Sequence, residues 1–212
     1  MSEPILTYWD TFGPELYQMG PQKHRLYMLD LLQEKGVKSL LDVGCGTAPI
    51  FELLWNGGAE WRSIKDYKGV DYSWRMIETC KEQFPSGNFE VQDMRKLKEP
   101  DNSWDCVLLM HSLDHTNNYQ AAIKEAARVA KRYVCIILWR SFVEEGTNLN
   151  NRNMYGKKEG EEPWEDTYLQ EYSKKALEDE FEKNGLVIEE TAEGEKLNEE
   201  NKYNFLFMLK KI

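Results

Sequence analysis

The segment from Leu40 to Pro49, LLDVGCGTAP, constrains the fold more than any other part of the chain. Its apolar run ends at Asp42 and passes directly into a Gly-x-Gly turn made by Gly44 and Gly46. Glycine allows positive φ angles and has no side chain, so a ligand can lie close to the main chain. A buried strand that ends in such a turn is typical of the nucleotide-binding edge of a parallel sheet.

The rest of the chain alternates between apolar runs and helical patterns. Strands are expected at 38–43, 67–72, 89–92, 106–110 and 133–139, and helices at 22–36, 49–57, 74–83 and 119–130. This order predicts βαβ units and a parallel sheet whose ligand loops share one edge.

A helix at 173–184 and strands at 186–191 and 203–212 follow. The connection between these two strands is too short for a crossover helix, so they should pair antiparallel. We therefore predict an α/β fold: a Rossmann-like, doubly wound, mostly parallel seven-stranded sheet with an antiparallel last strand.

The domain organisation follows from length and from one polar segment. A chain of 212 residues is typical of a single domain, residues 1–212, with residues 1–36 as an N-terminal helical cap. Residues 140–172 are polar with scattered aromatic side chains and follow the strand at 133–139. They are a candidate substrate lid over the ligand edge, and an ordinary surface insertion is the alternative.

Charge and cysteine patterns exclude several classes of function. The net charge is −10, and residues 144–200 hold 18 acidic and 7 basic side chains, so binding to nucleic acid is disfavoured. With no run of about 18 apolar residues and no signal sequence, we expect a cytoplasmic protein without membrane contact. The four cysteines form no C-x-x-C pair, so free buried thiols are expected and a metal site is not.

Two common nucleotide motifs fail at the glycine turn. The dinucleotide fingerprint G-x-G-x-x-G/A requires a small residue at the position of Pro49, and the P-loop requires Lys followed by Ser or Thr. No Tyr-x-x-x-Lys pair follows the fourth strand either. An oxidoreductase that uses NAD or a nucleotide sugar is therefore disfavoured.

The sequence DVGCGTA, from Asp42 to Ala48, resembles the acidic-x-Gly-x-Gly-x-Gly loop of class I S-adenosylmethionine-dependent methyltransferases, with Ala48 at the third glycine. Three further matches occur at successive strand ends: GVDYS at 69–73, VQDM at 91–94 and WDCVLLMHSLDH at 104–115. The final helix and two antiparallel strands also resemble the family's reversed last strand, so the resemblance covers nearly the whole chain. The resemblance, to the small-molecule methyltransferases of type 11, implies S-adenosylmethionine as cofactor and in-line methyl transfer to a small-molecule acceptor.

The resemblance also implies roles for single residues. The cofactor's amino-acid and ribose portions would contact the glycine loop, at Asp42, Gly44, Cys45 and Gly46. Asp71 would accept both ribose hydroxyls, because a carboxylate can take two donors, and Tyr72 would lie along the adenine.

The remaining cofactor contacts would come from later strand ends and from the N-terminus. Asp93 would accept the exocyclic amine of adenine, and the Met94 amide would meet a ring nitrogen. Met110 would lie near the methionine portion. Tyr8 or Trp9 would close over the cofactor, although aromatic residues at such positions also serve simply to cover a core.

The candidate catalytic residue is His111. The methyl donor is already activated, so the protein mainly aligns the reactants, but an oxygen acceptor needs a base, and His111 or Asp114 could serve. A structural histidine is the alternative for His111.

The class of acceptor, and whether the chain is catalytic, are two further questions. The fourth strand lacks the Asn-Pro-Pro-Tyr-type motif of nucleic-acid amino methylases, which favours a small molecule over DNA or RNA, while a protein acceptor stays open. A non-catalytic module that binds S-adenosylmethionine or S-adenosylhomocysteine and acts through a protein partner would share every cofactor motif.

Overall fold

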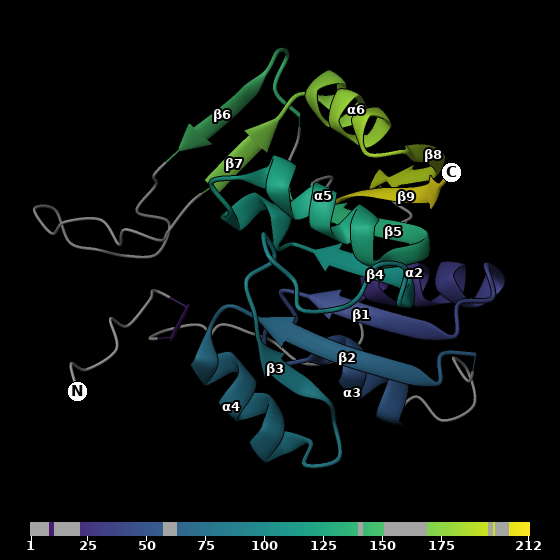
Figure 1. Cartoon of the computed structure of the whole chain (residues 1–212), viewed down its shortest axis with the longest axis vertical. Coiled ribbons are helices and arrows are strands. Elements are labelled where there is room, and N and C mark those ends of the chain that lie inside the picture. The colour runs from purple at the N-terminus through teal and green to yellow at the C-terminus, as the bar shows by residue number, and fades with distance from the viewer. Residues whose placement is uncertain are drawn as a thin grey trace, which may run out of the picture.

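A seven-stranded sheet forms the centre of the computed structural model, which describes residues 9–10, 22–56, 63–139, 142–150, 169–194, 197 and 204–212. The strand order is β3-β2-β1-β4-β5-β9-β8 (Figure 1). In chain order the strands are β1 (Ser39–Val43), β2 (Asp66–Asp71), β3 (Phe89–Val91), β4 (Trp104–Met110), β5 (Ala130–Leu138), β8 (Leu186–Glu193) and β9 (Phe205–Lys211).

Strands β1 to β5 run parallel, and β9 lies between β5 and β8, antiparallel to both. The predicted Rossmann-like sheet with a reversed last strand is therefore confirmed. The strand order switches direction between β1 and β4, the point at which open α/β sheets bind their ligands. Because Leu138 at the end of β5 pairs with Phe205, β9 begins at the edge where β4 and β5 end.

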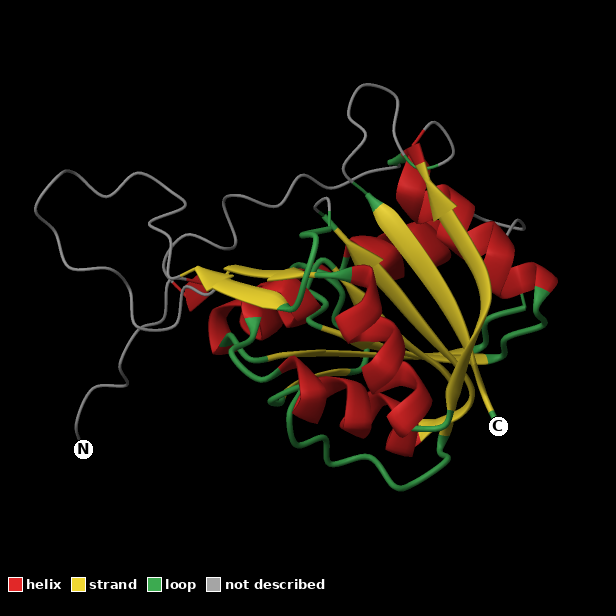
Figure 2. Cartoon of the chain, turned by 90° about the horizontal axis from the view of Figure 1, so that it is seen from above, coloured by secondary structure: helices red, strands yellow, loops and turns green. Residues whose placement is uncertain are grey.

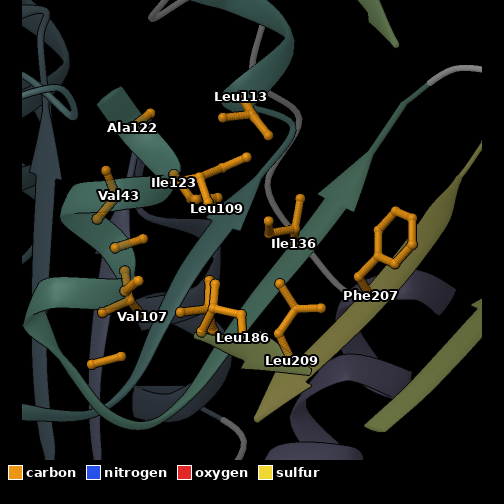
Figure 3. Packing of buried hydrophobic residues seen from close by; sticks show 14 of the residues in the cluster. Val43, Val107, Leu109, Leu113, Ala122, Ile123, Ile136, Leu186, Phe207 and Leu209 are labelled. Carbon is orange, nitrogen blue, oxygen red and sulfur yellow. The ribbon is translucent and has the colours of Figure 1, made fainter. Parts of the chain in front are cut away.

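Helices cover both faces of the twisted sheet (Figure 2). Apolar side chains of α2 (Lys23–Glu34) and α3 (Pro49–Asn56) pack on one face. Those of α5 (Tyr119–Val129) and α6 (Lys174–Lys183) pack on the other, where Figure 3 shows Ala122 and Ile123 against Val107 and Leu109. The strands β4, β5 and β9 contribute to both clusters, which explains why they read as unbroken apolar runs.

Side-chain caps fix where helices begin. Ser73 Oγ accepts from the Met76 N–H (3.2 Å) at the start of α4 (Trp74–Gln83), and Asn118 Oδ1 accepts from the Ala121 N–H (3.1 Å) at the start of α5. Ser173 caps α6 in the same way. Each cap satisfies a backbone donor that the helix itself leaves unpaired.

The polar segment 140–172 contains two strands that its sequence did not indicate, β6 (Thr147–Asn150) and β7 (Leu169–Tyr172), paired antiparallel. The Tyr172 hydroxyl donates to the Leu113 carbonyl (2.6 Å), and its ring meets Tyr119 at 5.1 Å. These contacts are tertiary and leave no periodic pattern in the segment, so a sequence pattern could not reveal them.

Two other sequence-level expectations concern cysteines and the membrane. Cys45, Cys80, Cys106 and Cys135 are all free and buried. Within the described ranges, no helix has the length and apolar character that crossing a bilayer requires.

Candidate functional site

A cavity of about 360 Å³ opens at the carboxyl ends of β1 to β4. Seven of the residues predicted for the site line it: Trp9, Gly44, Asp71, Tyr72, Asp93, Met94 and His111. Four other predicted residues do not line the cavity: Asp42, Cys45, Gly46 and Met110. Tyr8 lies outside the described residues.

The glycine loop begins directly after β1 with left-handed backbone. Gly44 has a φ of 80°, and the N–H groups of Gly44 and Cys45 both donate to the Val70 carbonyl, at 2.7 and 3.1 Å. Gly46 (φ 55°) and Ala48 (φ 60°) are also left-handed. The one departure from the glycine pattern, Ala48, thus keeps the conformation for which glycine is favoured.

Asp71 joins the glycine loop to the start of α4. Its Oδ2 accepts from the Gly46 N–H and its Oδ1 accepts from the Ser73 N–H, both at 2.9 Å. Burial raises the pKa of Asp71, and backbone donors at Ser73, Gly46 and Tyr72 oppose the shift. A carboxylate has about four acceptor positions. A donor from a ligand can therefore still bind on the cavity side.

Asp42 lies behind the loop rather than in the cavity. Its Oδ2 accepts from the Tyr67 hydroxyl at 2.7 Å, and its Oδ1 has no hydrogen-bond partner among the described residues. Burial, only partly offset by that hydrogen bond, raises the pKa of Asp42 to about 7. The side chain is therefore positioned to support the loop and to respond to a nearby positive charge.

This raised pKa should make stability depend on pH. The folded-state pKa of Asp42, about 7, exceeds the unfolded value of about 4, so its contribution is fully present below pH 4 and is lost as the pH rises through 7. Relative to Asp42→Asn, which keeps an acceptor for Tyr67, the free energy of unfolding of the wild type should fall by up to about 4 kcal/mol over this range. Urea titrations at several pH values measure this difference, and a difference independent of pH would contradict the assignment.

The far rim of the cavity carries an arginine bridge. Arg95 Nε and Nη2 donate to the two carboxylate oxygens of Asp93, at 2.9 and 2.7 Å, and its Nη1 donates to Asn117 Oδ1 at 2.9 Å. Burial acts to raise the pKa of Asp93, but the hydrogen bonds and charge of Arg95 outweigh it and the pKa is lowered. Asp93 is therefore a charged acceptor that any ligand amine would share with Arg95.

Two more predicted residues border this end of the cavity. Tyr72 is 56% exposed, so its ring is accessible to a planar ligand. Met94 is half-buried and packs against the apolar cluster under α5.

His111 directly follows β4 and has a φ of 53°, a rare conformation for a residue other than glycine. Its Nε2 lies 3.1 Å from Asn204 Oδ1, and its ring lies 4.9 Å from His24 and 5.2 Å from Trp139. Burial, followed by the nearby His24, lowers the pKa of His111 well below its usual value. The imidazole is therefore neutral at pH 7 and keeps a lone pair that can accept a proton.

Asp114, the other candidate base, has a different position. Its carboxylate is buried and accepts from the Trp139 N–H at 3.2 Å, and it does not line the cavity. Of the two candidates, His111 is the one that borders the cavity.

The N-terminal turn is attached to the same edge. Trp9 lines the cavity, and its ring meets His115 edge-on at 4.8 Å. The buried Asp10 accepts from the Ser73 hydroxyl at 2.6 Å, which anchors this turn to the start of α4. The sequence singled out the aromatic residue but carried no signal for Asp10.

The remaining predicted residues support the loop from behind. Cys45 is buried, and the Cys80 thiol donates to the Gly46 carbonyl at 3.1 Å. Met110 is buried in the cluster under α2 and α3.

Eight lining residues were not predicted: Val43, Met76, Gln92, Arg95, Ser112, His115, Thr116 and Asn117. Four of them, Val43, Gln92, Arg95 and Ser112, directly neighbour a residue predicted for the site, so for these the available signal was their place at a strand end. No group of three or more metal-binding side chains is found among the described residues.

Comparisons with known proteins find methyltransferases. A family model described as a methyltransferase domain matches residues 41–137. The ubiquinone/menaquinone biosynthesis C-methyltransferase of Campylobacter jejuni is 26% identical over 106 residues, 50% of this chain and 45% of the relative. Phosphoethanolamine N-methyltransferase 3 of Arabidopsis thaliana is 28% identical over 131 residues, 58% of this chain and 25% of the relative. The matches thus span less than half the length of these curated relatives.

Among solved structures, magnesium protoporphyrin IX methyltransferase from Synechocystis PCC 6803, crystallised with bound S-adenosylmethionine, superposes with a TM-score of 0.65. Its sequence identity is 15%, and the superposition covers 97% of this chain and 94% of that one. The likeness confirms the fold predicted from the sequence.

Proposed function

We propose that this chain, whose residues 41–137 match a methyltransferase-domain model and whose fold is that of a solved methyltransferase, is a class I methyltransferase that binds S-adenosylmethionine at the carboxyl edge of the sheet and methylates a small molecule. One observation carries the proposal. Asp71, at the end of β2, borders the cavity while it holds the Gly46 N–H, so the glycine loop and an acceptor for ribose hydroxyls are already positioned together.

The cavity suits this cofactor in size and chemistry. A volume of about 360 Å³ is within the range of small-molecule pockets, about 300–1,000 Å³. Asp71 is assigned to the ribose, Tyr72 to the adenine face, and Asp93 with the Met94 amide to the adenine edge. The backbone of Gly44 and Gly46 would face the amino-acid portion, with Asp42 behind it as the counter-charge for the ammonium group.

Methyl transfer then requires alignment and control of one proton. S-adenosylmethionine supplies a methyl group on a positively charged sulfur, so the donor needs no further activation. The chain's part is to bind and orient the reactants, with Trp9 covering the cavity. His111 borders the cavity as a neutral imidazole and is assigned to accept a proton from the methyl acceptor.

A small-molecule acceptor is supported by the net charge of −10, which disfavours a nucleic-acid acceptor, and by the position of His111 in the lining of the cavity. We assign acceptor choice to the segment 140–172, whose strand β7 is anchored at Leu113, two residues from His115 of the cavity lining. The buried free thiols support a reducing compartment, which we take to be the cytoplasm.

Ligand binding and turnover test the two halves of the proposal. Excess S-adenosylmethionine or S-adenosylhomocysteine should raise the melting temperature, corresponding to about 3 kcal/mol at 100 times Kd, while NAD should not. Transfer of labelled methyl groups to small molecules in a metabolite extract should follow. No stabilisation by either sulfur compound would refute the cofactor assignment, and binding without any transfer would favour the non-catalytic module.

A further inference from the structure

Three side chains from distant parts of the chain form a hydrogen-bonded row beside the cavity. His24 lies near the start of α2, Asn204 directly precedes β9, and His111 directly follows β4. Asn204 Nδ2 lies 3.3 Å from His24 Nδ1, and Asn204 Oδ1 lies 3.1 Å from His111 Nε2. His24 and Asn204 are buried, whereas His111 borders the cavity. The row therefore runs from the protein interior to the cavity wall.

The reversed strand brings these residues together. A parallel strand would end at this edge of the sheet, but β9 begins there, because Phe205 pairs with Leu138 at the end of β5. Asn204 is thus held by the sheet next to His111. Helix α2 places His24 beside both residues, with its ring centroid 4.9 Å from that of His111.

The chemistry of an amide fixes the protons along this row. An amide oxygen can only accept and an amide nitrogen can only donate. His111 Nε2 must therefore carry the hydrogen that Asn204 Oδ1 accepts, and His24 Nδ1 must be the bare nitrogen that accepts from Asn204. A neutral imidazole carries one N–H, so Nδ1 of His111 is also bare. The hydrogen bond found for the His111 ring among the described residues is the one at Nε2.

We propose that Asn204, backed by His24, is a positioning residue that locks His111 as its Nε2–H tautomer and leaves Nδ1 free to take the proton of the methyl acceptor. The inference rests on the proposed function. When the acceptor is methylated, its O–H or N–H bond breaks and the proton forms a new N–H bond at Nδ1. The electron pair left on the acceptor bonds to the methyl group as the methyl–sulfur bond breaks, and the sulfur keeps that bond's electrons as a neutral thioether. His111 then carries one positive charge, which Asn204 Oδ1 stabilises through the Nε2–H.

The surroundings of His111 favour rapid release of that proton to solvent. The groups around His111 are His24 and Arg25 from α2, His115 from the turn after β4, and the neutral Asn204. Of these, only Asn204 raises the pKa of His111; burial and the cationic or potentially cationic neighbours lower it. A protonated His111 is thus short-lived, and the lock keeps the neutral ring in the productive tautomer between turnovers.

Nitrogen NMR of histidine side chains tests the lock directly. The chain has three histidines, so ¹⁵N-histidine spectra of the full chain can be assigned with His24→Gln and His115→Gln. At pH 7 the wild-type His111 should show a protonated Nε2 and a bare Nδ1. Asn204→Leu, which removes both amide groups, should give a mixture of the two tautomers. A protonated Nδ1 in the wild type, or an unchanged tautomer in Asn204→Leu, would overturn the proposal.

A second variant allows the contact to be tested if Asn204→Leu does not fold. Asn204→Asp retains an acceptor for the Nε2–H and adds a negative charge, so the pKa of His111 should rise by at least about one unit. A pKa that stays within about 0.3 units of the wild type would count against the contact. The wild-type tautomer alone decides the proposal if both variants are unstable.

Cofactor binding separates this proposal from the proposed function. Calorimetry with S-adenosylhomocysteine should give Asn204→Leu the affinity of the wild type within about threefold, because Asn204 does not line the cavity. Failure of the wild type to bind would refute the cofactor assignment while the tautomer result stands by itself. A large loss of affinity in Asn204→Leu alone would show that the row shapes the cofactor site rather than positioning a base.

Discussion

Asp71→Ala is expected to weaken S-adenosylhomocysteine binding at least 100-fold in calorimetry. The change removes the acceptor assigned to the ribose and also frees the N–H groups of Gly46 and Ser73, which Asp71 now holds at 2.9 Å. A hydrogen bond to a charged group is worth about 1.5–3 kcal/mol, so the loss of two corresponds to roughly 100-fold or more in affinity.

Asp66→Ala is the matched control. Asp66 stands on the same strand at its opposite end, is exposed, and does not line the cavity. The Asp66→Ala variant should bind S-adenosylhomocysteine with the affinity of the wild type. Urea unfolding of both variants reports any general loss of structure. If the folded Asp71→Ala variant bound within about threefold of the wild type, the ribose assignment would be wrong.

Gly44→Ala should lower the free energy of unfolding by about 3 kcal/mol or more and abolish binding of S-adenosylhomocysteine. A Cβ on Gly44 would lie 2.3 Å from Ser112 Cβ, and Gly44 has a φ of 80°. The left-handed conformation costs an alanine about 1–2 kcal/mol, and overpacking adds about 1–3 kcal/mol. Ser112, which donates to the Val43 carbonyl at 2.8 Å, would have to move, and both residues line the cavity.

Gly36→Ala separates backbone strain from the clash. Gly36 has a similar φ of 66°, but a Cβ there would meet nothing within 4 Å. Urea unfolding should show a loss of about 1 kcal/mol for this variant, with cofactor binding unchanged. If the free energy of unfolding fell equally in the two variants, Ser112 would be able to move away from the added Cβ without loss of stability, and the crowding at Gly44 would not be important.

The fold could be predicted because its signals are local. Glycine turns, serine and asparagine caps and unbroken apolar runs each mark one element, and their order limits the topology. The boundaries shifted where tertiary packing decides them: β5 begins at Ala130, immediately after α5, and β4 begins at Trp104. The pair β6 and β7 was missed because its anchor, Tyr172, bonds to Leu113, a residue 59 positions away.

The site was predictable to the extent that it consists of strand ends. Gly44, Asp93 and His111 follow strands and Asp71 is the last residue of one, so the topology brings them to one edge. Arg95 on Asp93 could not be foreseen, because the bridge depends on rotamers rather than on spacing. The role now assigned to Asn204 requires knowing that β9 enters the sheet at the ligand edge.

The pairing of β6 with β7 has a consequence for how such a chain can change. Asn150 pairs with Leu169, so the β6–β7 pairing holds the two ends of the intervening stretch next to each other. Once the ends of a loop are closed, doubling its length costs only about 0.6 kcal/mol of entropy. A change in the length of the chain between residues 150 and 169 therefore costs little loop-closure entropy. Under the proposed assignment of acceptor choice to this segment, its length could vary without a change at Asp71 or at the glycine loop.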